Sequence, residues 1–185
     1  MMPAKSSRPN YRCLFTLIGV ILVVPAIAEA QAVKLTGTVS ETVALDIAPD
    51  WTESDVHAVS SGGTVRLTLS GKGAGPAVIR VPLLVRSNSG FKISGKFEST
   101  TAQLAQLSVM DVRATGRLVA PDVINSLQIR PEFDLSSPFV LLTGPRVSLG
   151  GTLNSPNNAL QITLLIHVKS DSVGGWLAHL TFFND

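Results

Sequence analysis

The sequence predicts an all-β fold, an antiparallel β-sandwich of about seven to nine strands. Three observations support this prediction. Apolar and polar residues alternate in most segments between turns, which is the period of a strand with one buried face. These segments are short and are separated by clusters of Gly, Pro, Asn and Ser. Helical periodicity is nearly absent, and the sequence contains neither an internal repeat nor a sign of a second domain.

The first predicted strand covers residues 33–47. Its odd positions are apolar or small, its even positions are mostly polar and rich in Thr, and Glu41 interrupts it. The polar residues 49–63, rich in Asp, Ser and Gly, are expected to form a loop. Strand character resumes at residues 65–70, and a glycine-rich turn follows.

Two hairpins are predicted further along the chain. Residues 79–85 and 91–97 alternate on either side of the turn formers at 87–90. The second predicted hairpin joins residues 160–169 and 176–182. Pro82 cannot donate to a ladder, so it predicts a sheet edge or a bulge in the 79–85 strand.

The segment between the hairpins is less regular. Its apolar residues change phase near Met110, which predicts a bulge, or else a brief helical turn around residues 101–107. Residues 121–127 are compatible with one short helix, and short strands are expected at 139–142 and at 147–149.

Residues 1–32 have the organisation of a cleavable secretory signal peptide. An apolar run from Cys13 to Ile27 follows a basic start, and small residues then permit cleavage after Ala30 or Ala32. The basic residues are Lys5, Arg8 and Arg12. The run is short and interrupted beside the roughly 20 residues of a membrane helix. Residues 33–185 are therefore expected to form a single exported domain without a membrane span, in the periplasm, at the cell surface or outside the cell.

Cleavage changes the charge and the cysteine content. The leader holds three of the 15 basic residues and one of the 13 acidic residues, so the remaining chain has equal numbers of both. This balance argues against a nucleic-acid partner. Cys13 is the only cysteine, so the exported domain is expected to be free of disulfides and to depend on burial and backbone pairing.

Candidate ligand-binding residues lie in the polar segment 49–63. Asp55 and His57 are close in sequence and could bind a cation, and Trp51 could stack on a sugar. The alternative is a solvated connection in which Asp and Ser form local turn bonds and Trp51 anchors the loop. No metal, cofactor or catalytic site is predicted, because nucleophile, base and stabiliser do not cluster in the sequence.

His167 and His179 lie on opposite arms of the last predicted hairpin, where they would become cross-strand neighbours. Two imidazoles on one face can hold a metal ion, but the spacing identifies no third ligand. Two surface histidines are the alternative interpretation.

The N-terminal segment Val33-Lys34-Leu35-Thr36-Gly37-Thr38-Val39-Ser40-Glu41-Thr42-Val43-Ala44-Leu45 resembles the opening of cysteine-free fimbrial major subunits (pilins) of the bacterial chaperone–usher, colonisation-factor type. The resemblance implies an immunoglobulin-like sandwich that a strand from a neighbouring subunit completes. It implies donor positions at Val33, Leu35, Gly37 and Val39. On the closing strand it implies assembly contacts at Trp176, Leu180 and Phe182. The implied partners are other copies of the chain or related subunits, a periplasmic chaperone and an outer-membrane usher.

Two functions are therefore expected, and neither is catalytic; a small metal-assisted hydrolase is a third and less favoured alternative. One is a structural or adhesive surface subunit that assembles by strand complementation. The other is a soluble periplasmic module that binds a carbohydrate or a protein through loops. The first strand could also pair within its own domain, which leaves donation and internal pairing open.

Overall fold

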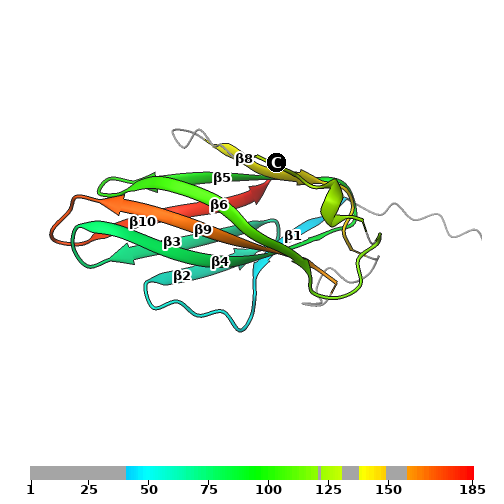
Figure 1. Ribbon diagram of the computed structural model, residues 1–185, viewed down its shortest axis with the longest axis horizontal. Coiled ribbons are helices and arrows are strands. Elements are labelled where there is room, and N and C mark those ends of the chain that lie inside the picture. The colour runs from blue at the N-terminus through cyan, green and yellow to red at the C-terminus, as the bar shows by residue number, and fades with distance from the viewer. Residues whose placement is uncertain (1–40, 121, 131–137, 149–157) are drawn as a thin grey trace, which may run out of the picture. The chain divides into compact units, whose positions relative to one another are not determined.

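The computed structural model describes residues 41–120, 122–130, 138–148 and 158–185. The chain divides into two units, Met1–Thr38 and Val39–Asp185, and every described strand lies in the second. These strands form two antiparallel sheets packed face to face (Figure 1). The prediction of an all-β sandwich is confirmed. The ten strands of the described residues slightly exceed the expected number.

The two sheets differ in size. In spatial order, the four-stranded sheet contains β1 (Val43–Ile47), β4 (Gly75–Ser87), β9 (Leu160–Ser170) and β6 (Gln103–Ala114). The six-stranded sheet contains β2 (Val56–Ser61), β3 (Thr64–Gly71), β10 (Trp176–Asn184), β5 (Phe91–Ser99), β8 (Phe139–Gly144) and β7 (Gln128–Ile129).

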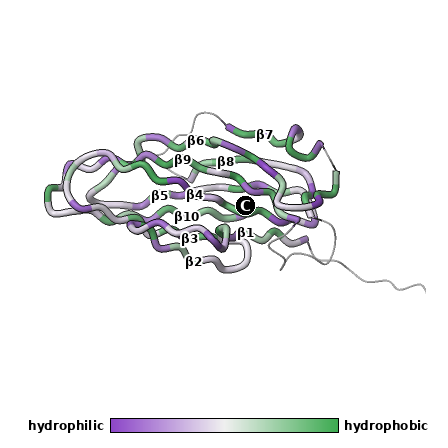
Figure 2. Tube along the Cα trace, turned by 60° about the horizontal axis from the view of Figure 1, so that its bottom comes forward, coloured by the Kyte–Doolittle hydropathy of each residue, from purple (hydrophilic) through white to green (hydrophobic). Residues whose placement is uncertain are grey.

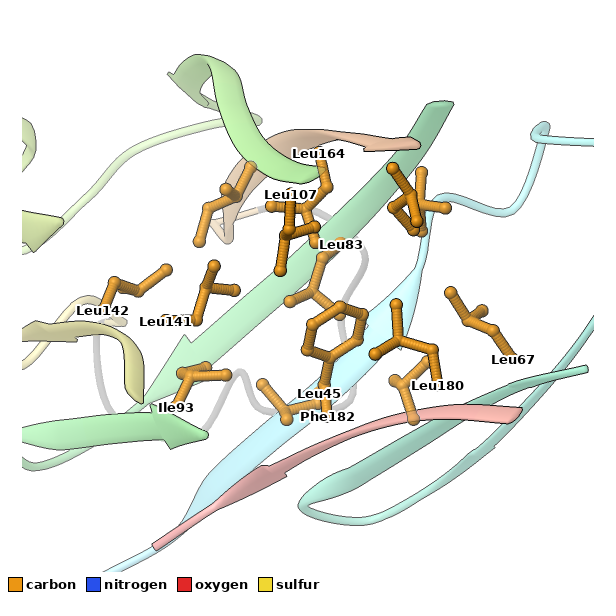
Figure 3. Close-up of a cluster of buried hydrophobic side chains, with 14 of the residues drawn as sticks. Leu45, Leu67, Leu83, Ile93, Leu107, Leu141, Leu142, Leu164, Leu180 and Phe182 are labelled. Carbon is orange, nitrogen blue, oxygen red and sulfur yellow. The ribbon is translucent and has the colours of Figure 1, made fainter. Parts of the chain in front are cut away.

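The core lies between the sheets and follows the alternation of the sequence. Leu83 and Leu164 from the four-stranded sheet face Leu67, Leu180 and Phe182 from the six-stranded sheet (Figure 3). All five are completely buried. Burying such a side chain contributes about 1.5–3 kcal/mol relative to exposure, and this burial joins the two sheets.

Both predicted hairpins are wrong. β4 and β5 lie in different sheets, and so do β9 and β10. Among the described strands, only β2–β3 and β7–β8 are consecutive strands that pair with each other. Alternation reports which face of a strand is buried, but it does not report the pairing partner. A strand whose successor in sequence crosses to the other sheet, as in immunoglobulin-like sandwiches, shows the same alternation as a strand in a hairpin.

Pro82 lies just beyond the end of β1, on a stretch of β4 whose outer side pairs with no described strand, so the predicted edge position is confirmed. β4 pairs with β9 along its length and with β1 at residues 83–87. The carbonyl of Pro82 accepts a hydrogen bond from the N–H of Ala48 at 3.0 Å. The ring nitrogen faces the same side, where β1 has just ended, so the missing N–H interrupts no ladder.

The irregular middle segment is the bulged strand β6. Its register with β9 shifts between Leu104 and Gln106 and again between Val109 and Asp111. Met110 is therefore a bulge residue, as the phase change predicted, and residues 103–107 are extended, not helical. The helix expected at 121–127 is a 3₁₀ turn, η1 (Ile124–Ser126).

Candidate functional site

β2 forms the outer margin of the six-stranded sheet and pairs with β3 alone among the described strands (Figures 1 and 2). The sequence analysis assigned these residues to a loop, which is wrong. The missed signal is Gly62-Gly63, a two-residue hairpin connection. Gly62 has a φ of 58°, which glycine adopts without steric cost.

The backbone of β2 leaves hydrogen-bonding groups on its free side. The N–H of Ser70 in β3 donates to the carbonyl of Asp55 at 2.9 Å. Backbone groups of successive residues in a strand point to opposite sides. Odd-numbered residues therefore face β3, whereas Ala58 and Ser60 direct their N–H and C=O groups away from the sheet.

A groove of about 350 Å³ runs beside this free edge. It is lined by Asp46, Ile47, Ala48, Pro49, Trp51, Thr52, Glu53, Val56, Ala58 and Ser60. Ile47, Trp51 and Val56 are half-buried and pack against the core, so the groove presents apolar surface beside its polar lining residues. The carboxylate of Asp46 approaches Arg86, with 3.4 Å between Oδ2 and Nη2, and accepts the Ile47 N–H at 2.8 Å. Asp46 is thus already engaged within the domain.

The candidate ligand residues Trp51, Asp55 and His57 do not come together. Trp51 packs against the core, and its N–H donates to the carbonyl of Ala48 at 3.0 Å. Asp55 is exposed at the start of β2. His57 is exposed on the outer face of the sheet, opposite Thr68. Trp51 therefore anchors the loop, and the three side chains do not share one binding surface.

The closing-strand residues Trp176, Leu180 and Phe182 belong to the core. Their exposed fractions are 6%, 0% and 0%. β10 is paired along both edges, with β3 and with β5, so a donated strand could join the described sheets only at a margin. The assembly role that the resemblance gives these residues stays a prediction.

His167 and His179 are not neighbours. His167 lies on β9 in the four-stranded sheet, and His179 lies on β10 in the other. His179 Nδ1 is 3.3 Å from Thr68 Oγ1. In the described ranges, His, Cys, Asp and Glu side chains do not gather in groups of three or more that could hold a metal ion.

A larger groove, of about 890 Å³, lies at the β5–β6 and β9–β10 turns. Leu177, which is 52% exposed, and His179 line it. Ser99 links the β5–β6 turn to β10, since its Oγ donates to the Leu177 carbonyl at 2.7 Å and accepts the Ala102 N–H at 3.0 Å.

A carboxylate with a lowered pKa borders this larger groove. Glu98 forms an ion pair with Lys96, with 2.6 Å between Nζ and Oε1. The hydrogen bond and positive charge of Lys96 hold the pKa of Glu98 below its ordinary value of 4.5, and Arg66 and His179 act in the same direction. Glu98 therefore remains ionised to lower pH than a free glutamate.

The chain enters and leaves the described sandwich at one end. The N–H of Thr42 donates to Asn88 Oδ1 at 2.7 Å. Asp185 and Glu41 line one groove there. The Asp185 carboxylate pairs with Lys92, whose hydrogen bond and charge lower the pKa of Asp185 below its ordinary value of 3.8. The predicted leader and the donor positions Val33, Leu35, Gly37 and Val39 lie outside the described residues.

Comparison with protein-family models, curated proteins and solved structures finds no match to this chain. The class of protein is therefore defined by its fold, an all-β sandwich. Within the described part of the chain, no helix has the length and apolar character needed to cross a membrane.

Proposed function

We propose that the protein is an exported structural or adhesive surface subunit, pilin-like, that assembles by strand complementation. The observation that carries the proposal is the edge of β2 that pairs with no described strand, beside a groove that is lined by both apolar and polar residues. Such an edge offers N–H and C=O groups to an added strand, and the groove offers sites for its alternate side chains. The proposed donor is the alternating segment that signal cleavage leaves at the N-terminus, residues 33–40.

The charge and core of the domain fit this role. After removal of the leader the chain has no charge excess and no cysteine. The described sandwich buries its core with its own strands, including β3 beside β10. A subunit of this kind can fold first and accept a neighbour's strand afterwards. Related subunits, a periplasmic chaperone and an outer-membrane usher remain its proposed partners.

Deletion of residues 33–40 tests the proposal. The chain from residue 31 or 33 should form a concentration-dependent ladder of oligomers by size-exclusion chromatography with light scattering. The chain that starts at residue 41 should remain a folded monomer with the same circular dichroism spectrum. A folded monomer at every concentration in the longer chain would count against assembly by strand donation.

A binding module is the second candidate, favoured by the 890 Å³ groove at the β5–β6 and β9–β10 turns. In that case Leu177 and His179 would contact a carbohydrate or protein ligand. A Leu177→Asp variant should then lose binding on a glycan or protein array, whereas deletion of residues 33–40 should leave binding intact. The assembly proposal expects the opposite pattern.

A further inference from the structure

The edges of the two sheets are protected to different degrees. An unpaired edge is a template for intermolecular pairing, and proteins block it with bulges, prolines, very short strands or covering segments. β6 is one such edge, and it is bulged at two places, next to Ala105 and Met110. Bulges twist an edge and interrupt its pattern of donors and acceptors, so β6 is a poor template.

The first half of β4 is a second free edge, because β1 pairs only with residues 83–87. The even-numbered residues of β4 face that side, as the Ala48–Pro82 hydrogen bond shows. Two of the four outward positions from 76 to 82 are prolines, Pro76 and Pro82. Only Val78 and Arg80 can donate, so this edge is blocked at both ends.

The outer margins of β1 and β7 are covered or short, and residues 96–99 of β5, which extend past the end of β8, include Lys96. The outer side of β1 is covered at its centre, where the N–H of Leu45 donates to the carbonyl of Gly62 at 2.9 Å. β7, at the far margin of the six-stranded sheet, has only two residues.

Among the described residues, no strand pairs with the outer side of β2, and residues 46–53 leave an open groove beside it. Its six residues pair with β3 in continuous register and include neither proline nor lysine. Val59 is 53% exposed on the outer face. Val56, Ala58 and Ser60 line the groove instead. An edge that pairs with no described strand and a groove with partly apolar lining therefore coincide at β2.

We propose that residues 33–39 of a second copy add to the free edge of β2 and extend the six-stranded sheet by one strand. This inference rests on the proposed function and specifies its acceptor site. The added strand would leave β3 in place beside β10. The backbone of the added segment would bond to Ala58 and Ser60.

The side-chain pattern of the donor matches this site. Val33, Leu35 and Val39 lie on one side of an extended segment, and lysine and threonine lie on the other. The apolar side would enter the groove against Ile47, Trp51 and Val56. The polar side would continue the outer face of the sheet, where His57 is exposed.

The path of the chain into β1 indicates that residues 33–39 add to β2 of a second copy and not to β2 of their own domain. At Thr42 the chain is still in register with β4, since the N–H of Asn88 donates to the Thr42 carbonyl at 3.2 Å. To reach its own β2, the segment would have to reverse direction at Ser40-Glu41-Thr42. Ser40 is the one common turn former in that tripeptide, which contains no Gly, Pro, Asn or Asp.

A matched pair of proline substitutions tests the acceptor edge in the chain that follows leader cleavage. Ala58→Pro and Val78→Pro each remove one outward N–H from an unpaired edge. Ala58→Pro should raise the concentration needed for half-maximal assembly by roughly tenfold or more. Val78→Pro should leave that concentration unchanged. The reverse pattern would place the acceptor on β4 and overturn the inference.

Hydrogen–deuterium exchange gives a second measurement that needs no substitution in β2. The Ala58 and Ser60 amides should exchange at least tenfold more slowly in assemblies of the unmodified chain than in the chain that starts at residue 41. Equal rates in the two samples would overturn the acceptor assignment, even if Ala58→Pro fails to fold.

The two proposals can fail separately. If deletion of residues 33–40 leaves assembly intact, the proposed function fails and the acceptor assignment fails with it. If the deletion abolishes assembly but the Ala58 and Ser60 amides are unprotected in the unmodified assemblies, strand donation stands and only the acceptor edge is wrong. If protection of these amides occurs in a monomer, the segment pairs within its own domain and donation to a second copy is excluded.

Discussion

The buried position of the Trp176 indole ring requires that residue 71 has no side chain. The two residues are directly opposite each other in the β10–β3 pair, and Trp176 is 6% exposed. A Cβ atom at Gly71 would overlap the indole ring. Here glycine permits a close approach, because the large ring lies over its backbone.

The substitution Gly71→Ala should therefore destabilise the domain by about 1–3 kcal/mol, since overpacking forces side chains or backbone to move. Gly174→Ala is the matched control. No atom lies within 4 Å of a Cβ built there, so its effect should be within about 0.5 kcal/mol. Denaturant unfolding followed by tryptophan fluorescence measures both values. Equal effects of the two substitutions would show that the indole ring can move away at low cost.

At the scale of an element, the bulge at Met110 lets β6 pair with β9 on one side while it disrupts the hydrogen-bonding pattern of the outer edge. Val109 pairs with Leu164 and Asp111 pairs with Thr163, so Met110, like Ala105, has no cross-strand partner position. Deleting Met110 would place the paired residues next to each other in regular alternation. The pairing of β6 with β9 should survive, while the outer edge of β6 becomes straighter.

The Met110 deletion should therefore fold and associate more strongly than the unmodified chain. Circular dichroism should retain the strand signal, and light scattering should show added association even when residues 33–40 are also deleted. A doubly deleted chain that remains monomeric would indicate that the bulge does not protect this edge.

For the whole molecule, stability depends on contact between the sheets across one core. The only cysteine, Cys13, cannot form an intrachain disulfide. Adjacent residues on β10 separate core from surface: Phe182 is completely buried, whereas Phe183 is half-exposed on the outer face. Phe182→Ala should cost about 3–5 kcal/mol of unfolding free energy. Phe183→Ala should cost about 1 kcal/mol or less.

Thermal and denaturant unfolding of the two alanine variants measure this difference. The large loss of stability expected for Phe182→Ala also limits its use in assembly experiments. A loss of assembly in this variant could result from unfolding as well as from a lost contact. Similar losses of stability in both variants would show that the outer face of β10 is covered as completely as the inner face.

The sequence alone was sufficient to predict the fold class, the buried faces of most strands and an irregularity near Met110, for which a bulge and a helical turn were both open. Each of these depends on local periodicity, since successive side chains of a strand point to opposite faces. The buried residues Leu180 and Phe182 follow directly from that pattern. The small and polar side chains of β2 obscured its alternation, so His57 was assigned to a loop.

Only the tertiary structure decided which strands pair and which edges remain open. A strand that pairs with its neighbour in sequence and a strand that crosses to the other sheet show the same alternation. The sequence therefore predicts a β9–β10 pair that the structure does not contain, and with it the wrong placement of His167 beside His179. The free groups of Ala58 and Ser60 depend likewise on which side β3 occupies. Pairing is a long-range property, because it is determined by how two sheets bury a common core, and local periodicity does not contain that information.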